Sequence, residues 1–535
     1  MNQFEKRKQK LNELCEKVFD VIVVGGGITG AGIVRDATFR GLDTLILDKG
    51  DFASGTSSKS GKLVHGGLRY LKSFQISLVF ESCLERFRLM KIVAPHLVKP
   101  TMFMLPFYKD SKTPRWLVAI GLFLYDLLSL FRNISTFKFE SIETLKENYP
   151  GLKTEGLIGG LSYYDCKVLD YRLTVETIKS ASLAGAHALN YLEVVGIDFS
   201  ETPIKVSVVD RVAGGSWVLK CSSVINASGA WADKVIELGA LGAKEKFNLG
   251  LTSGIHIFVS KLKFPIKKTI SVEAIQDKRP LYAVPWGEYV LIGTTDKYYK
   301  EDLGHQKINR ADVTYLLDNL KHYFPGRPIT KEDIVFISSG VRPLIGSSDG
   351  LSESEVSRDF EIRYSSAGML SVTGGKLTTY RHMAKMVVNE LISKKFSDKQ
   401  QLDLPTLSPL IPKNTEDESI SEDSKKLFDT YGSEARSILK IWENDSAKKE
   451  EIYLGAELSF GELDYFLDHE FAQSISDIFL RRSELAQLAH PLEDNEWEKI
   501  VEYLSAYSGL GSEYWHQSVK DYLSEINQNM EILRN

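Results

Sequence analysis

Three basic side chains in the second half of the chain could together bind a phosphate group. Arg342 and Arg358 flank a polar stretch, and Lys376 follows a Gly-Gly pair in a strand-to-helix turn. Guanidinium groups donate paired N–H groups to phosphate oxygens, and an ammonium group adds a point charge. We expect Lys376 just inside a helix, where a cation opposes the helix dipole and needs an anionic partner. Isolated arginines are usually surface or ion-pair residues, so the clamp is a hypothesis that other parts of the chain must support.

Two histidines are candidates for a general base. His256 lies in a strand-like run, and His65 lies in a loop that also carries Arg69, Tyr70 and several small hydroxyl residues. An imidazole can take the proton of a substrate hydroxyl near neutral pH, but a single histidine is more often a buried structural residue. The loop suits close contact with a flat, polar-edged cofactor, and a solvated Ser/Gly loop is the alternative. The residues alone leave these readings open.

Residues 18–48 predict the elements that would position a dinucleotide. An apolar strand runs into Gly25-x-Gly27-x-x-Gly30, a helix follows, and a second apolar strand ends at Asp48. Gly25 permits the tight turn, Gly27 lacks the Cβ that would block a pyrophosphate, and Gly30 lets the helix pack on the strand. The pyrophosphate would lie at the helix N-terminus, and Asp48 would accept the ribose hydroxyls. The pattern predicts an ADP-containing dinucleotide, against the alternative of a purely structural glycine turn.

Two further turns follow apolar strands. In the run VINASGAW, Ala227 and Gly229 form a small-residue turn that would let backbone approach a ligand, although a plain strand-to-helix connection explains it nearly as well. In the run LSVTGGKLTTYRHMA, Gly374 and Gly375 lead into a helix and expose a second helix N-terminus. For a flavin, that dipole would stabilise the negative charge that gathers on reduction.

The composition is that of an ordinary globular protein. The 535 residues are too many for one core and suggest about two or three domains. The net charge of -5 does not indicate a nucleic-acid-binding protein, which usually carries an excess of positive charge. The first twenty residues contain no apolar signal-peptide core, and the four cysteines show neither zinc nor C-x-x-C spacing. We expect a cytoplasmic protein with no metal site.

The organisation along the chain indicates an α/β core followed by helices. Residues 17 to about 390 alternate between strand-like runs, glycine turns and amphipathic stretches. Residues 395–425 contain scattered prolines and dense charge, which predict a linker. Residues 426–535 have apolar residues at helical spacing. The runs 197–209 and 217–224 predict an antiparallel hairpin. Together with other strand-like runs they are expected to build a second sheet against the nucleotide domain; those runs are 256–260, 281–284, 289–293 and 334–338.

Residues 116–131 form an apolar segment interrupted by Asp126 and Ser129 and flanked by Arg115 and Arg132. The segment is shorter than the roughly 20 residues that span a bilayer. A helix lying at a membrane interface is one prediction. A buried helix or a subunit contact, which would allow a homodimer, is the alternative.

Three motifs in the correct order closely resemble the FAD-dependent (aerobic) glycerol-3-phosphate dehydrogenase family: those at 25–41, 62–71 and 374–384. Residues 455–485 look like that family's helical cap domain, so the resemblance covers nearly the whole chain. It implies an α/β FAD-binding Rossmann-like domain with an interleaved β-rich substrate domain, plus a C-terminal all-helical domain. The implied division is a core at 1–395, with FAD-binding parts at about 17–75, 170–235 and 340–395, a linker at 396–425 and helices at 426–535.

The resemblance implies oxidation of sn-glycerol 3-phosphate to dihydroxyacetone phosphate, with a base taking the C2 hydroxyl proton while hydride passes to flavin N5. It makes His256 the expected base, with His65 as its competitor. Arg342 and Lys376 would also act in the catalytic site. The substrate site would be lined by Arg69, Tyr70, His65 and Arg358. The expected FAD contacts are Gly25, Gly27, Gly30, Asp48, Thr56, Ser57, Ser58, Gly66, Gly67, Ala227, Gly229, Gly374, Gly375, Leu377 and Thr378.

The electron acceptor is open at this stage. Dehydrogenases that resemble this chain pass electrons to quinone, whereas related oxidases use O2 and make H2O2. No long insertion precedes Pro285, and the apolar segment at 116–131 would suit peripheral contact with the cytoplasmic face of the inner membrane, so quinone is favoured. An amino-acid oxidase of the same build fits the basic residues less well. A non-catalytic flavin-binding regulatory protein is the alternative from another class.

Overall fold

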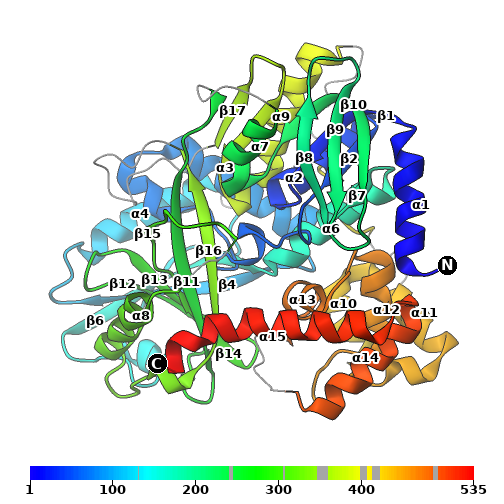
Figure 1. The fold of residues 1–535 in the computed structure, drawn as a ribbon. Coiled ribbons are helices and arrows are strands. Elements are labelled where there is room, and N and C mark those ends of the chain that lie inside the picture. Colours follow the sequence, from blue (N-terminus) through cyan, green and yellow to red (C-terminus); the bar gives the residue numbers. More distant parts are fainter. Residues whose placement is uncertain are drawn as a thin grey trace.

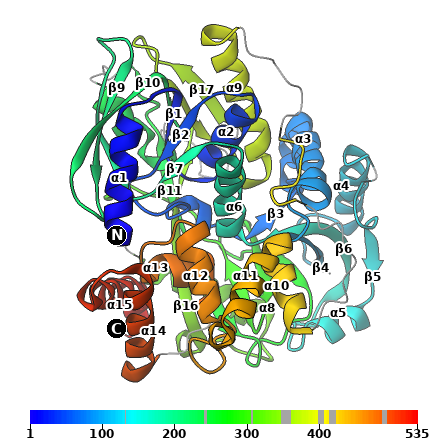
Figure 2. The same cartoon turned by 90° about the vertical axis from the view of Figure 1, so that its right-hand side faces the viewer.

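Two β-sheets and a group of C-terminal helices make up the molecule. The computed structural model describes residues 1–130, 132–239, 245–304, 308–345, 360–397, 406–412, 422–485 and 492–534. Figures 1 and 2 show the first sheet with its helices at the top and the C-terminal helices below it. The predicted α/β core with an interleaved second sheet and a helical C-terminal part is confirmed.

The first sheet is a parallel sheet covered on both faces. Its path runs β17 (Phe360–Tyr364), β18 (Leu370–Gly374), β10 (Ser216–Asn226), β1 (Val18–Val24), β2 (Thr44–Leu47) and β7 (His187–Leu189). Only β17 on this path is antiparallel to its neighbour. Val21 and Val23 of β1 face helices α2 (Ile28–Phe39), α6 (Asp170–Leu183) and α9 (Tyr380–Lys395). Ile22 and Val24 face α1 (Gln3–Cys15) and α7 (Ala232–Leu238), so apolar residues are required on both sides of the strand.

The predicted hairpin is only partly right. β9 (Ile204–Asp210) does pair antiparallel with β10, but the run 197–209 is not one strand, because β8 (Leu192–Asp198) ends within it and β9 begins only at Ile204. Asp198 accepts the backbone N–H of Ser200 at 2.9 Å, and Pro203 has no N–H for a ladder, so the chain turns there. These strands extend the first sheet through β10 and do not build the second one, which corrects the expectation.

The second sheet contains the other predicted strands. The runs at 256–260, 281–284, 289–293 and 334–338 lie in strands of this sheet, as expected. Its path runs β15 (Lys297–Tyr298), β11 (Gly250–Ser260), β14 (Tyr289–Gly293), β13 (Pro280–Trp286), β12 (Thr269–Glu273), β4 (Val98–Tyr108), β6 (Leu157–Val168) and β3 (Leu63–Val64). β16 (Ile334–Leu344) pairs with β11, and β5 (Lys138–Glu140) pairs with β6.

Helices also pack against the second sheet. In the described part of the chain they include α3 (Ile76–Arg88), α4 (Arg115–Leu128), α5 (Ile142–Asn148) and α8 (Arg310–Tyr323). α4 is the predicted apolar helix, and it is buried on one side only: Leu122 and Tyr125 are fully covered, whereas Trp116 is 63% and Phe123 is 53% exposed. Among the residues that the structure describes, no helix combines the length and apolarity needed to cross a bilayer.

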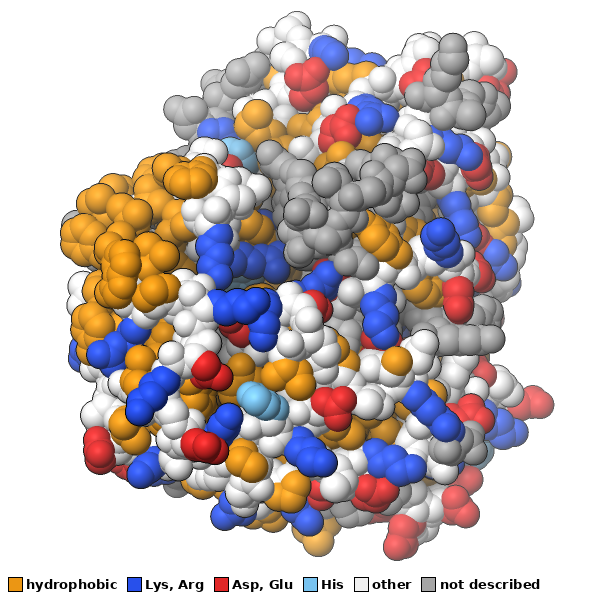
Figure 3. All heavy atoms as spheres, turned by 90° about the vertical axis from the view of Figure 1, so that its left-hand side faces the viewer, with side chains coloured by type: hydrophobic (Ala, Val, Ile, Leu, Met, Phe, Trp, Pro, Cys, Tyr) orange, Lys and Arg blue, Asp and Glu red, His pale blue; other side chains and the backbone are white. Residues whose placement is uncertain are grey.

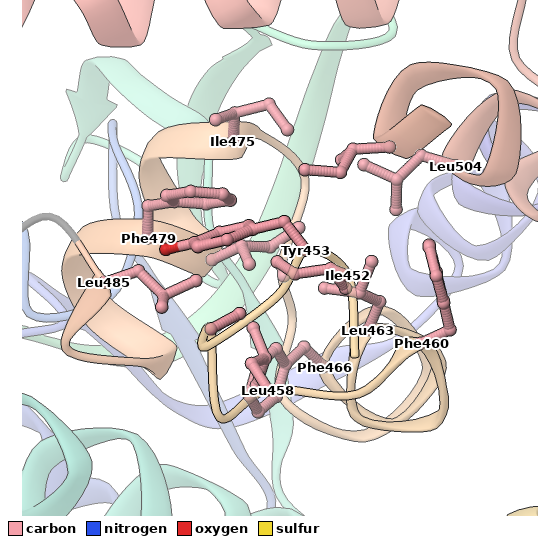
Figure 4. Packing of buried hydrophobic residues seen from close by; sticks show 14 of the residues in the cluster. Ile452, Tyr453, Leu458, Phe460, Leu463, Phe466, Ile475, Phe479, Leu485 and Leu504 are labelled. Carbon is pink, nitrogen blue, oxygen red and sulfur yellow. The ribbon is translucent and has the colours of Figure 1, made fainter. Parts of the chain in front are cut away.

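The C-terminal helices share a hydrophobic core with strands of the second sheet, which contribute Phe258, Val284 and Phe336 to it. The helices are α10 (Glu422–Tyr431), α11 (Ala435–Asn444), α12 (Phe460–His469), α13 (Ile475–Asp477), η10 (Ile478–Arg482), α14 (Asp494–Ser508) and α15 (Ser512–Arg534). Figure 4 shows Tyr453, Phe466 and Phe479 within this core. α15 crosses the front of the molecule in Figure 1, and its last residues pack against the core of the second sheet.

The described part of the predicted linker lies on the core. Leu410 is buried and donates its backbone N–H to Val93 at 2.7 Å. The guanidinium of Arg35, on α2, donates to the Thr406 carbonyl at 2.9 Å. Residues 406–412 therefore pack against the nucleotide-domain helices.

Candidate active site

A cavity of about 2220 Å³ runs between the two sheets. Its walls come from the carboxyl ends of β1, β2, β10 and β18 and from β11, β13 and β16 of the second sheet. Sites for one small ligand usually measure about 300–1,000 Å³. The cavity is therefore large enough for an extended cofactor and a second molecule beside it.

The first glycine turn has no room for side chains. Gly25 has φ +112°, and a Cβ on it would lie 2.6 Å from the Ala227 carbonyl oxygen. A Cβ on Gly30 would collide with the carbonyl of Gly25, so helix α2 lies directly on the strand end. A Cβ on Gly27 would meet only the Ser57 hydroxyl, at 3.1 Å. The turn thus presents bare backbone to the cavity at the start of a helix, the arrangement that suits a pyrophosphate.

Asp48 supports the same turn from the end of β2. Its carboxylate accepts the backbone N–H of Gly26 at 2.7 Å and that of Gly50 at 2.9 Å. Burial raises the pKa of Asp48 to about 6, and these two N–H groups oppose that rise. Asp48 also lines the cavity, so its remaining lone pairs are available for ribose hydroxyls.

The second glycine turn differs from the prediction at Lys376. Gly374 and Gly375 have φ of +81° and +79°, and Lys376 is extended (φ -139°, ψ 153°). The short helix η7 (Leu377–Thr379) begins only after Lys376, so the expectation that this lysine lies inside a helix is wrong. The ammonium instead lies 3.7 Å from the centroid of the Tyr70 ring, as a cation–π contact at the cavity wall.

A third turn, at Gly66 and Gly67, is held from behind. Gly67 has φ +77°, and the Gly66 N–H donates to the Tyr125 hydroxyl of α4 at 2.8 Å. Thr378, after the second glycine turn, accepts the His65 N–H at 3.2 Å. The His65 loop and the second glycine turn are therefore joined directly.

His256 lies in the middle of β11, opposite Gly293 of β14. A Cβ on Gly293 would collide with the imidazole, so the glycine makes room for the ring. Among the described residues, Nδ1 has no hydrogen-bond partner although the side chain is buried. Burial, with smaller contributions from the positive charges of Arg342 and Lys62, lowers the pKa of His256 from 6.5 to about 3. The usual imidazole pKa near neutrality, which makes a histidine a candidate base, therefore does not hold for His256, whose ring is neutral at neutral pH.

Arg342 is held with its guanidinium in the same cavity. One Nη donates to the Thr294 hydroxyl at 2.8 Å, and the other donates to an Asp296 carboxylate oxygen at 3.2 Å. A Cβ on Gly254 would lie 2.7 Å from both Nη atoms, so this glycine leaves space for the fork. Burial lowers the pKa of Arg342, as does the nearby Arg69. These cations give the cavity a positive end.

The structure brings most of the predicted site residues to one cavity. Gly30 and Gly66 are not among the residues that line it, and Arg358 lies outside the described residues. Those that line the cavity are Gly25, Gly27, Asp48, Thr56, Ser57, Ser58, His65, Gly67, Arg69, Tyr70, Ala227, Gly229, His256, Arg342, Gly374, Gly375, Lys376, Leu377 and Thr378.

Other lining residues escaped prediction from the sequence. Tyr282 comes from an ordinary strand of the second sheet, and Trp231 follows the Gly229 turn. Glu525, Gln528 and Asn529 come from α15, more than a hundred residues beyond the last predicted motif. No local pattern marks these residues, because only the packing of distant elements turns them toward the cavity.

The donor set fits a flavin dinucleotide. The bare turn at Gly27 and the acid at Asp48 suit the nucleotide half, and the buried, unpartnered Nδ1 of His256 marks a polar position at the other end. Gly67, Gly374 and their neighbours would contact the ring between these ends.

Comparisons with known proteins agree with this geometry. Residues 20–381 match the family described as FAD dependent oxidoreductase, and residues 374–514 match the C-terminal domain of alpha-glycerophosphate oxidase. The aerobic glycerol-3-phosphate dehydrogenase of Staphylococcus saprophyticus is 34% identical over 530 residues, covering 94% of this chain and 93% of the relative.

Solved structures share the fold over different lengths. The glycerol-3-phosphate dehydrogenase of Bacillus halodurans, complexed with FAD, is 26% identical, with a TM-score of 0.79 and 99% of both chains covered. The L-alpha-glycerophosphate oxidase of Mycoplasma pneumoniae with FAD bound is 15% identical, with a TM-score of 0.56 over 74% of this chain and 99% of that one. The second likeness concerns the fold alone.

Proposed function

Because the chain belongs to the family of FAD-dependent aerobic glycerol-3-phosphate dehydrogenases, we propose that it oxidises sn-glycerol 3-phosphate to dihydroxyacetone phosphate and passes the electrons to a quinone. The observation that supports the site assignment is one cavity that joins the dinucleotide turn at Gly27, the base candidate His256 and the cations Arg342 and Lys376. Bound FAD supplies the hydride acceptor.

His256 is the proposed base for the C2 hydroxyl. Its imidazole is neutral at working pH, because its pKa is lowered to about 3 chiefly by burial. The arrival of a dianionic phosphate beside Arg342 would offset the cations that depress this pKa and raise the affinity of the ring for the proton. His65 lines the same cavity and stays the competing base.

Five other residues are proposed to hold the substrate. Arg342, fixed by Thr294 and Asp296, would bind phosphate oxygens through its fork, and Lys376 would add a second cation. Arg69 donates to the Tyr70 hydroxyl at 3.2 Å, and both residues line the cavity beside Lys376. Arg358 is retained as a proposed fifth contact.

The apolar side of the cavity favours quinone over oxygen as the acceptor. Leu105 and Phe107 of β4 line it together with Leu117, Ile120 and Leu124 of α4. The same three α4 residues are 47%, 49% and 43% exposed, so the apolar lining continues onto the outer surface. A quinone with an isoprenoid tail needs such a surface, whereas O2 needs none.

The outer face of α4 is proposed to dock on a membrane. Figure 3 shows a contiguous hydrophobic patch on the side of the molecule where Figure 1 shows α4. The exposed apolar side chains of α4 include Trp116 and Phe123. A large exposed apolar patch marks an interaction site, and a helix of this kind suits the interfacial layer of a bilayer.

We also keep, as a proposal, the division into a core at 1–395, a linker at 396–425 and helices at 426–535.

Rapid mixing tests the acceptor. Enzyme reduced by glycerol 3-phosphate under anaerobic conditions is mixed either with a quinone analogue or with O2-saturated buffer, and the return of flavin absorbance is followed. We expect reoxidation by the quinone to be at least tenfold faster. Faster reoxidation by O2, with H2O2 formed, would identify an oxidase. Absence of bleaching by glycerol 3-phosphate would contradict the proposed activity and leave an amino-acid oxidase or a non-catalytic flavin-binding protein.

Vesicle flotation tests the docking face. Ile120→Glu places a charge in the patch, and Leu262→Glu is a matched control, because Leu262 is 87% exposed on a turn away from α4. We expect only the α4 variant to lose association with anionic phospholipid vesicles. The patch is a subunit contact if neither the wild-type protein nor Ile120→Glu binds vesicles, and if the wild-type protein elutes as a dimer that Ile120→Glu dissociates.

A further inference from the structure

Asp51 links the dinucleotide turn to the C-terminal helices. It lies in the loop after β2, three residues beyond Asp48, whose carboxylate holds the Gly26 N–H. The Ala53 N–H donates to the Gly26 carbonyl at 3.0 Å. Residues 48–53 therefore hold both the N–H and the carbonyl of Gly26 in the glycine turn. A shift of this loop would move the turn.

Two arginines of η10 bind the Asp51 carboxylate. Arg482 donates from both Nη atoms, one to each carboxylate oxygen, at 2.9 Å, and Arg481 donates from Nε at 2.7 Å. All three side chains are buried, the most exposed being Arg481 at 8%. Burial by itself raises the pKa of Asp51, but Arg482 and Arg481 outweigh it and hold that pKa below its ordinary range. The carboxylate is therefore charged and neutralised by another part of the chain.

The arginines are themselves fixed from the C-terminal side. Arg481 donates to Asp477 at 2.7 Å, and Arg482 donates through Nε to the Glu470 carbonyl at 2.7 Å. Arg481 also lines the main cavity. The C-terminal helices thus both supply part of the cavity wall and hold the loop that supports the glycine turn.

We propose that Asp51, Arg481 and Arg482 are positioning residues for FAD, so that retention of the cofactor depends on the docking of the C-terminal helices. The proposal rests on the placement of the FAD nucleotide at Gly25–Gly27–Gly30 given above. Breaking one partner of a buried ion pair leaves the other charge uncompensated, which forces the loop to rearrange. Because binding couplings are reciprocal, bound FAD must in turn stabilise the docked position of η10.

Dissociation of FAD from the holoenzyme provides the test. Arg482→Lys keeps the charge but loses the two-pronged contact with Asp51. Loss of one charge-assisted hydrogen bond corresponds to about a tenfold change or more, and such changes act mainly on the dissociation rate. We expect flavin fluorescence to appear at least tenfold faster after dilution of Arg482→Lys than after dilution of wild-type holoenzyme.

A second interface variant separates cofactor positioning from general stability. Glu434→Gln removes the partner of Lys179 on α6, an ion pair between the same two parts of the molecule that does not involve the Asp51 loop. We expect this control to lower the thermal midpoint while the FAD dissociation rate stays within twofold of wild type. Equal acceleration in both variants, or in neither, would overturn the proposal.

Hydrogen exchange of unsubstituted protein provides a measurement that needs no variant to fold. Removing FAD is expected to increase amide exchange in residues 478–482 as well as in residues 48–54. Exchange in 478–482 that does not respond to FAD would contradict the coupling. Protein that binds no FAD at all would overturn the cofactor assignment itself, which is a different result from FAD binding without coupling.

Discussion

Removal of the Arg342 guanidinium should strongly reduce the preference for a phosphorylated substrate. The side chain is anchored by Thr294 at 2.8 Å and by Asp296 at 3.2 Å. Truncating one partner of a buried, hydrogen-bonded charge pair costs about 2–5 kcal/mol, which corresponds to about 30-fold to several thousand-fold in kcat/KM. Arg279 also pairs with Asp296, at 3.1 Å, so this carboxylate keeps a cation in Arg342→Ala and the fold should survive.

The assay compares flavin bleaching by glycerol 3-phosphate and by glycerol, which lacks the phosphate. In Arg342→Ala, kcat/KM for glycerol 3-phosphate should fall by about 30-fold to several thousand-fold, while the slow reaction with glycerol stays unchanged. Added guanidinium ion should restore part of the activity with glycerol 3-phosphate. Arg342→Lys should lose about tenfold, because an ammonium cannot form the paired contact. Arg363→Lys is a control on β17, outside the cavity wall. Equal losses with both substrates would refute the phosphate role and show that Arg342 only maintains the site.

Three other predictions follow from the same geometry. His256→Gln should lower kcat by about 10²–10⁴-fold with little change in KM, as expected for loss of a general base; an unchanged kcat would transfer the role to His65. Folded His256 has a pKa of about 3 and unfolded histidine about 6.5, so the unfolded chain binds more protons between these values and stability falls with falling pH. Wild-type protein without substrate should therefore lose about 1.4 kcal/mol per pH unit between about pH 6 and 4 that His256→Gln does not lose, seen as a smaller acid shift of Tm in the variant. Gly30→Ala should purify without flavin, since its Cβ would collide with the Gly25 carbonyl; a yellow, FAD-loaded variant would show that the turn can relax.

Much of the nucleotide domain was predictable because its signals are local. The order of strand, glycine turn, helix and strand in β1, α2 and β2 agrees with the sequence pattern, since backbone sterics at Gly25 and burial on both faces of β1 act within a few residues. The strands around His256 and the helices after residue 426 were recognisable for the same reason.

Predictions that depended on partner elements were less reliable. The alternating pattern of 197–209 identifies strand residues, but it carries no information on which sheet they join, and β10 recruits them into the first sheet. Lys376 was expected inside a helix because glycines preceded a helical pattern, whereas its extended backbone turns the ammonium onto Tyr70 from another segment. The lowered pKa of His256 has no signal in the sequence, because burial between β11 and β14 is a property of the assembled sheet.

The amino-acid sequence by itself determined where nucleotide-binding backbone, apolar strands and helices would form, because these depend on neighbours along the chain. Only the tertiary structure decided that β11 and β16 pair so that Arg342 and His256 share one strand pair, and that Arg481 and Arg482 reach Asp51 from more than four hundred residues away. Charge neutralisation and desolvation depend on distance in space, so they are set when the sheets and the C-terminal helices pack together.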